Sequence, residues 1–323
     1  MVSRIGGRKF LLEGEEKGRL WSCISRAAAF SGVELLSWAI MDNHFHLLVR
    51  VLERQEVSDA ELERRMSVLY GHAKFAAVKD KWASWIKHGN GVRVLDEKAR
   101  LRNRMFDLSQ FCKTFKEEYS QDYNRRHENT GTIWEGRFKS ILVEGSARAL
   151  STVSSYIHLN PVRAGIAKRP EEAKWTSFGA ACSGNESART ALCALSGRAF
   201  GAKFSDWASA RAKLLSIMSG EMAGATASVS EWMAARAKDP VLARFFPAED
   251  DETAKNLAAP VDFGALLMQR VVSFLHGGAI GGFAFLAMAA RLLPQRRRRR
   301  SRLLLDDCRI PDLTPLAGSR GAS

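Results

Sequence analysis

Two short segments of the sequence carry side chains whose spacing could do chemistry. The first is "MDNHFHLLVR", residues 41–50, in which one residue separates His44 from His46. Successive side chains of a β-strand point to opposite faces, so the two imidazoles would share one face and Phe45 would point to the other. Neutral imidazole nitrogens bind divalent metal ions. Taken alone, two histidines that merely line a polar strand face are the more economical explanation, because a short motif is only a hypothesis.

The second segment is "SYIHLNPVRAG", residues 155–165. On a helix, Tyr156 and Asn160 are one turn apart and share a face, which differs from the apolar stripe of the same helix. A tyrosine in that position can be a nucleophile, a hydrogen-bond donor or a surface aromatic, and the amide can offer an oxygen to a metal. His158 points elsewhere and is expected to be a surface or supporting residue.

Together the two segments could build a metal-assisted phosphoryl-transfer site. A metal held by the histidines would polarise a phosphate and stabilise the leaving oxygen. The tyrosine would attack phosphorus and become covalently linked to it. Basic side chains nearby in the sequence would hold the nucleic-acid backbone; these are Arg125, Arg126, Arg137, Lys139 and Arg163.

Three sequence blocks in this order carry a resemblance to a known family. "MDNHFHLLV", "GTIWEGRFKS" and "YIHLNPVRAGI" resemble the signature blocks of the HUH single-strand tyrosine transposases, within the IS200-like transposases. The REP-associated tyrosine transposases are the most similar branch. The resemblance covers roughly residues 4–180, and it leads us to expect that the chain starts partway along the first strand that family members carry.

The resemblance implies a ferredoxin-like fold and assigns roles to four residues. His44 and His46 would be the metal-binding histidine pair, and Asn160 would complete the metal site for Mg²⁺ or Mn²⁺. Tyr156 would form a 5′-phosphotyrosine on single-stranded DNA and release a 3′-OH. The substrates of the family are hairpin-forming DNA elements, and its members act as homodimers or as monomers, so both states stay open here.

The charge of the chain agrees with a nucleic-acid partner. Lys and Arg number 49 against 35 Asp and Glu, which gives a net charge of +14. Such an excess favours a polyanion, although a basic protein without such a partner and a non-catalytic binder of hairpin DNA remain alternatives. Five dispersed cysteines without a C-x-x-C pair, and no secretory signal, lead us to expect a cytoplasmic protein.

The hydrophobic pattern predicts an α+β fold, with helices on one face of a small antiparallel sheet. Short polar turns join two of the strands into a hairpin. Ser58, Asp107 and Ser146 are the expected helix N-caps, and Gly32 and Pro161 the expected helix ends. The predicted elements are a strand within 2–12, a helix at 15–30, strands at 33–40 and 44–51, a helix from 58, looped insertion at 75–105, a helix at 107–127, a strand at 132–143 and a helix at 147–160.

A composition shift near residue 180 predicts two parts. Residues 1–180 would be the catalytic domain, and residues 181–323 a mainly helical region with a basic tail. Residues 271–290 are nearly uncharged and about long enough to span a bilayer. Because His276 and four glycines interrupt that stretch, we expect buried helices there and no membrane attachment.

Overall fold

The computed structural model describes residues 1–200, 206–219 and 279–280, which fall into two compact units. The first unit joins Met1–Phe138 to Ala173–Ser183, and the second holds Lys139–Glu172 and the described residues from Gly184 onward. Residues 139–172, which the sequence analysis assigned to the catalytic domain, thus belong to the second unit. A single catalytic domain over residues 1–180 stays a prediction.

The first unit contains a three-stranded antiparallel sheet in the order β1-β3-β2. The strands are β1 (Val2–Arg4), β2 (Val33–Ile40) and β3 (His44–Val51). The predicted β2–β3 hairpin and the α+β class are confirmed. A ferredoxin-like sheet has four strands, whereas the described part of this sheet has three.

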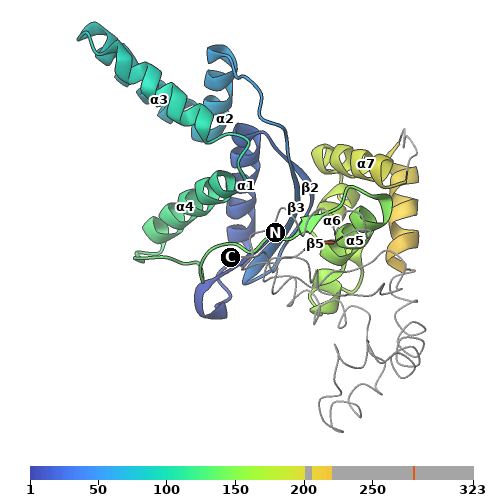
Figure 1. The fold of residues 1–323 in the computed structure, drawn as a ribbon. Coiled ribbons are helices and arrows are strands. Elements are labelled where there is room, and N and C mark those ends of the chain that lie inside the picture. The colour runs from blue at the N-terminus through green and yellow to red at the C-terminus, as the bar shows by residue number, and fades with distance from the viewer. Residues whose placement is uncertain (201–205, 220–278, 281–323) are drawn as a thin grey trace, which may run out of the picture. The chain divides into compact units, whose positions relative to one another are not determined.

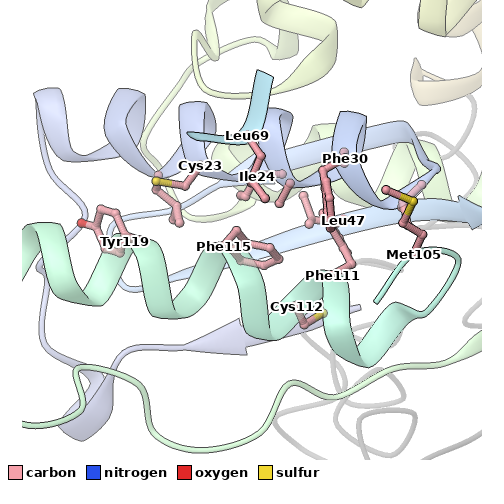
Figure 2. Packing of buried hydrophobic residues seen from close by; sticks show 14 of the residues in the cluster. Cys23, Ile24, Phe30, Leu47, Leu69, Met105, Phe111, Cys112, Phe115 and Tyr119 are labelled. Atoms are coloured by element: carbon pink, nitrogen blue, oxygen red, sulfur yellow. The ribbon is translucent and has the colours of Figure 1, made fainter. Parts of the chain in front are cut away.

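Helices α1 (Glu15–Ser31) and α4 (Leu108–Arg126) pack against one face of the sheet (Figure 1). Figure 2 shows the aromatic residues of α4 directed at α1 and β3. Phe111, Phe115 and Tyr119 lie on one stripe of α4 and are completely buried. Asp107 caps this helix as predicted, because its carboxylate accepts a hydrogen bond from the Gln110 amide at 2.8 Å.

Gly32 ends α1, as the sequence predicted. Its backbone is left-handed, with φ of 66°, a conformation that glycine adopts without strain. A Cβ atom at this position would lie 2.4 Å from the ring of Phe106. The close approach of Phe106 therefore requires glycine here, and it lets β2 follow α1 without a longer loop.

The expectation of a looped insertion at residues 75–105 is wrong. Helix α2 (Asp59–Lys87) starts after the predicted cap Ser58 and pairs with α3 (Gly91–Asn103). Trp82 is buried with Val94 in the pair. The basic residues of the segment obscured a helical spacing of apolar ones, which are Phe75, Val78, Trp82 and Trp85.

The predicted strand at 132–143 is also wrong over most of its length. Of the residues of this segment that lie in the first unit, only Trp134 forms an isolated bridge, to Ile5. The amide of Trp134 binds the Thr132 hydroxyl at 3.2 Å, and its indole donates to Ser120 Oγ at 2.8 Å. These side-chain bonds fasten the segment to α4 as a loop and compete with a strand ladder.

The remaining elements are short or lie in the second unit. Helix α5 begins after the predicted cap Ser146 but continues past Pro161, which was expected to end it. The turn stays closed because the amides of Ala164 and Ile166 bond to Asn160 and Pro161 carbonyls at 3.0 and 2.8 Å. The elements are η1 (Gly6–Arg8) and α6 (Ser177–Cys182) in the first unit, and β4 (Leu142–Val143), α5 (Ala147–Arg163), η2 (Pro170–Glu172), α7 (Glu186–Phe200), a helix at 207–219 and β5 (Ala279–Ile280) in the second.

Among the described residues, no helix has the length and apolar character needed to cross a membrane. The uncharged stretch at 271–290 lies outside the described residues, apart from positions 279–280.

Candidate functional site

The two histidines of β3 lie side by side on one face of the sheet. Their ring centroids are 4.9 Å apart in an edge-to-face arrangement. Phe45 points to the opposite face, where its ring packs 5.5 Å from Phe115 and 5.8 Å from Trp134. The face assignment made from strand alternation is therefore confirmed, and the buried phenylalanine fixes the strand that carries both imidazoles.

The turn that precedes the histidines is held by a buried cation. Lys17 of α1 is buried, and its ammonium lies 2.5 Å from the carboxylate of Asp42. The Asp42 carbonyl accepts a hydrogen bond from the Leu12 amide at 2.8 Å. Breaking such a pair would leave an uncompensated buried charge. The turn is thus clamped between α1 and the loop before it.

Asn43 sets which nitrogen of His44 carries the proton. The Asn43 side-chain amide donates to the Arg8 carbonyl at 3.2 Å, which directs its Oδ1 the other way. That oxygen lies 2.7 Å from His44 Nδ1. Because the amide oxygen can only accept, Nδ1 is the protonated nitrogen and Nε2 keeps its lone pair. A second residue that fixes the tautomer in this way is typical of metal-binding histidines.

Both histidines are neutral near pH 7. Burial is the main cause that lowers the pKa of His44, to about 4; Arg4 lowers it further and Asp42 opposes the change. Burial, followed by the neighbouring His44, holds the pKa of His46 well below its usual value. Neutral rings keep the lone pairs that metal binding needs, so the pair fits the role of two metal ligands.

Arg4 is a candidate site residue that the sequence analysis missed. In the β1–β3 register it is directly opposite His44, while Val2 is opposite His46. Residues directly opposite each other in an antiparallel pair share a face, so the guanidinium belongs to the face of the histidines. No carboxylate in the described residues forms an ion pair with it. The alternation of β1 could have revealed it, had the strand been limited to residues 2–4.

In the second unit, three predicted residues of α5 share one side. Tyr156 is buried, and the Arg163 guanidinium carbon lies 5.4 Å from the centre of its ring. The side-chain amide of Asn160 donates to the Tyr156 carbonyl at 2.9 Å. This bond turns the Asn160 Oδ1 away from its own helix, as a metal ligand would require. The helical spacing alone brings these three side chains together.

His158 is fully buried, so the expectation that it could be a surface residue is wrong. Burial lowers its pKa to about 3, and the ring is neutral. Its neighbours in the helix from Ser154 to Asn160 are buried too. This part of α5 is therefore buried on the face of Tyr156 and Asn160 as well as on the apolar stripe.

The other predicted DNA-binding cations have different surroundings. Arg126 binds the carboxylates of Glu16 and Asp122, which links α4 to α1. Arg125 is exposed and pairs with Asp122 at 2.6 Å. Arg137 and Lys139 are exposed, in the first and second unit respectively.

Across the residues that the structure describes, no three His, Cys, Asp or Glu side chains gather where they could hold a metal ion. The expected ligand set instead combines two histidines of the first unit with an amide of the second. The histidine pair meets the chemical requirement for two of these ligands.

Residues 1–84 match the family model described as "Transposase IS200 like". Over these residues, the chain is similar to the IS200-like transposase family. The predicted resemblance to this family is thereby confirmed over these residues, and the matched segment includes the whole histidine hairpin. Transposases act on DNA and generally use divalent metal ions. No curated protein and no solved structure matches the chain.

The match ends before "GTIWEGRFKS" and "YIHLNPVRAGI". The tyrosine and amide assignments therefore depend on the sequence resemblance and on the geometry of α5, while the histidine pair has the support of the family match as well.

Proposed function

We propose that the protein is a metal-dependent strand transferase for single-stranded DNA that forms hairpins. The observation that carries the proposal is the histidine pair: two neutral imidazoles share one sheet face, and Asn43 fixes the tautomer of His44. The apolar core contacts of this strand come from Phe45 and Leu47, which alternate with the two histidines.

Three side chains would hold the metal, namely His44, His46 and Asn160. A bound Mg²⁺ or Mn²⁺ would polarise the scissile phosphate and stabilise the leaving oxygen. Arg4, on the histidine face, would attract the phosphate and orient its non-bridging oxygens through charge-assisted hydrogen bonds. Arg163 would add a second cation beside the tyrosine ring.

Tyr156 is the proposed nucleophile. Its Oη forms a bond to phosphorus while the bond between phosphorus and the 3′ oxygen breaks. The phenol loses its proton and the 3′ oxygen gains one through solvent, which leaves a 5′-phosphotyrosine and a free 3′-OH. Attack by a 3′-OH on this linkage reverses the step and rejoins DNA without an external energy source.

The experiment uses labelled single-stranded oligonucleotides that contain hairpins from the flanking genomic DNA, incubated with the full chain and Mn²⁺. A denaturing gel should reveal a covalent protein–DNA adduct. The Tyr156→Phe variant should form none, whereas the matched control Tyr70→Phe should form it normally. An adduct that persists in Tyr156→Phe would refute the nucleophile, and tight hairpin binding without any adduct would favour a non-catalytic DNA-binding protein.

A further inference from the structure

The paired helices α2 and α3 form a projection whose function the histidine and tyrosine segments do not explain. We call residues 72–100 the arm. Figure 1 shows both helices running away from the sheet of the first unit. The arm has its own small core, in which Trp82 donates to Glu97 at 3.0 Å and Lys81 pairs with Glu97 at 2.8 Å. These contacts hold the two helices as one rigid element.

The arm is strongly basic. Within residues 72–100 the sequence has seven Lys or Arg against three Asp or Glu, about three times the average net charge per residue of the chain. Lys81 and Lys98 pair with carboxylates. No ion pair among the described residues neutralises the others, which are exposed: Lys74, Lys79, Lys87, Arg93 and Arg100.

The surface of the arm suits a phosphate backbone better than unstacked bases. Proteins that bind single strands present aromatic rings on which bases stack. In the arm Trp82 is buried, and Phe75 and Trp85 are half-buried, each beneath a lysine ammonium. From Lys74 to Lys87 the helix advances about 20 Å, so its cations could meet several phosphates along a rigid duplex.

Three exposed aliphatic residues near the end of the arm suggest a second candidate partner, which is another copy of the chain. Ile86, Val92 and Leu95 are 61, 69 and 66% exposed, and such residues can join two copies of a chain. Two arms of the same positive charge would repel each other, whereas a polyanion complements them. The charge of the arm therefore favours nucleic acid over a second copy.

We propose that the arm is a second DNA contact, which binds the phosphate backbone of duplex DNA without regard to sequence. The inference rests on DNA being the partner of the proposed function, but it does not depend on strand cleavage. Contacts of this kind strengthen binding and make it sensitive to salt, because each neutralised phosphate releases counterions.

The test measures the affinity of the full chain for a duplex of about 30 base pairs and arbitrary sequence, from about 50 to 200 mM salt. EDTA in the buffer prevents metal-dependent cleavage. The arm variant combines Lys87→Gln, Arg93→Gln and Arg100→Gln. The control variant combines Arg19→Gln, Arg64→Gln and Lys113→Gln, which remove the same charge from cations that pair with carboxylates on their own helices.

We expect the slope of log affinity against log salt to become shallower by about 2 to 3 units in the arm variant. The control variant should keep most of the original slope. Equal slopes in the two variants, or an unchanged slope in the arm variant, would overturn the proposal. A change in oligomeric state without a change in slope would instead identify the arm as an interface between copies. Because cleavage is not measured, failure of the Tyr156 assignment leaves this result unaffected.

Discussion

The histidine hairpin of the first unit and helix α5 of the second position their chemical groups in different ways. His44 and His46 depend on contacts from distant parts of the chain: Lys17 clamps the preceding turn, and Asn43 connects His44 to Arg8. Tyr156 and Asn160 are related by the helix itself.

This difference predicts where substitutions should act. Around the hairpin, residues that never touch a metal ion should still alter the affinity of the histidine pair for that ion, because they fix the turn and the tautomer of His44. Along α5, the relation between the tyrosine and the amide should survive changes elsewhere in the protein as long as the helix persists.

Replacing either histidine by alanine should have the largest effect. We expect His44→Ala and His46→Ala each to lower the rate of adduct formation by at least about 100-fold, since each removes a metal ligand. Hairpin affinity should change little, because phosphate contacts dominate DNA binding. Filter binding and gel assays on the same preparations measure both quantities. A parallel loss of affinity and cleavage would argue against the ligand role.

Asn43→Ala should weaken Mn²⁺ binding by about 10-fold, the lower end of the range for residues that orient a metal-binding histidine. Without its acceptor, His44 is free to adopt the other tautomer. Asn43→Asp keeps an acceptor oxygen next to Nδ1 and should retain most of the affinity. Calorimetric titration with Mn²⁺ measures the affinity of each variant. Equal affinities in the alanine variant and the unaltered protein would show that Asn43 does not orient His44 for metal binding.

Arg4→Gln should slow adduct formation by about 10-fold at saturating DNA, the value of one charge-assisted hydrogen bond to phosphate. Arg4→Lys should recover part of the rate, because the charge remains although the two-pronged geometry is lost. The effect should appear in the maximal rate. Were only the half-saturating DNA concentration to change, Arg4 would be a general DNA contact.

Glu16 provides a prediction about stability and pH. Burial would raise the pKa of Glu16, but hydrogen bonds from Arg126, Tyr119 and His127 outweigh it and lower the pKa to about 2. A carboxylate with a lowered pKa stabilises the fold above its unfolded pKa of 4.5, and loses that contribution as the pH falls towards 2.

Glu16→Gln should therefore lower the free energy of unfolding by about 2 kcal/mol at pH 7, and by progressively less between pH 4.5 and pH 2. Urea denaturation at several pH values measures the difference. The matched control is Glu117→Gln on α4, whose exposed ion pair at 3.9 Å should contribute under about 0.5 kcal/mol. A difference that does not depend on pH would contradict the assigned pKa.

Much of the first unit could be predicted from the sequence because its signals are local. Strand alternation placed His44 and His46 opposite Phe45, and side-chain caps located the starts of α2 and α4. The predictions failed where contacts between residues far apart in the sequence determine the local structure. The indole of Trp134 reaches α4 and turns an apolar strand-like segment into a loop.

The candidate site shows the same division. The four candidate residues of the two motifs were proposed from their spacing and from the family resemblance, but Arg4 was not. Its place beside His44 is set by the register of β1 on β3, which pairs residues 40 positions apart in the chain. Likewise the basic composition of the arm suggested loops, although its apolar residues pack two helices together.

The central claim is that the histidine pair and Tyr156 serve one reaction centre. The most direct measurement incorporates 3-fluorotyrosine into the protein and follows its ¹⁹F resonances during titration with Mn²⁺; the signal that disappears in Tyr156→Phe identifies position 156. The account predicts that Mn²⁺ broadens this signal strongly in the unaltered protein and only weakly when His44 and His46 are both replaced by alanine. A Tyr156 resonance that stays sharp after Mn²⁺ has saturated the histidine pair would contradict it.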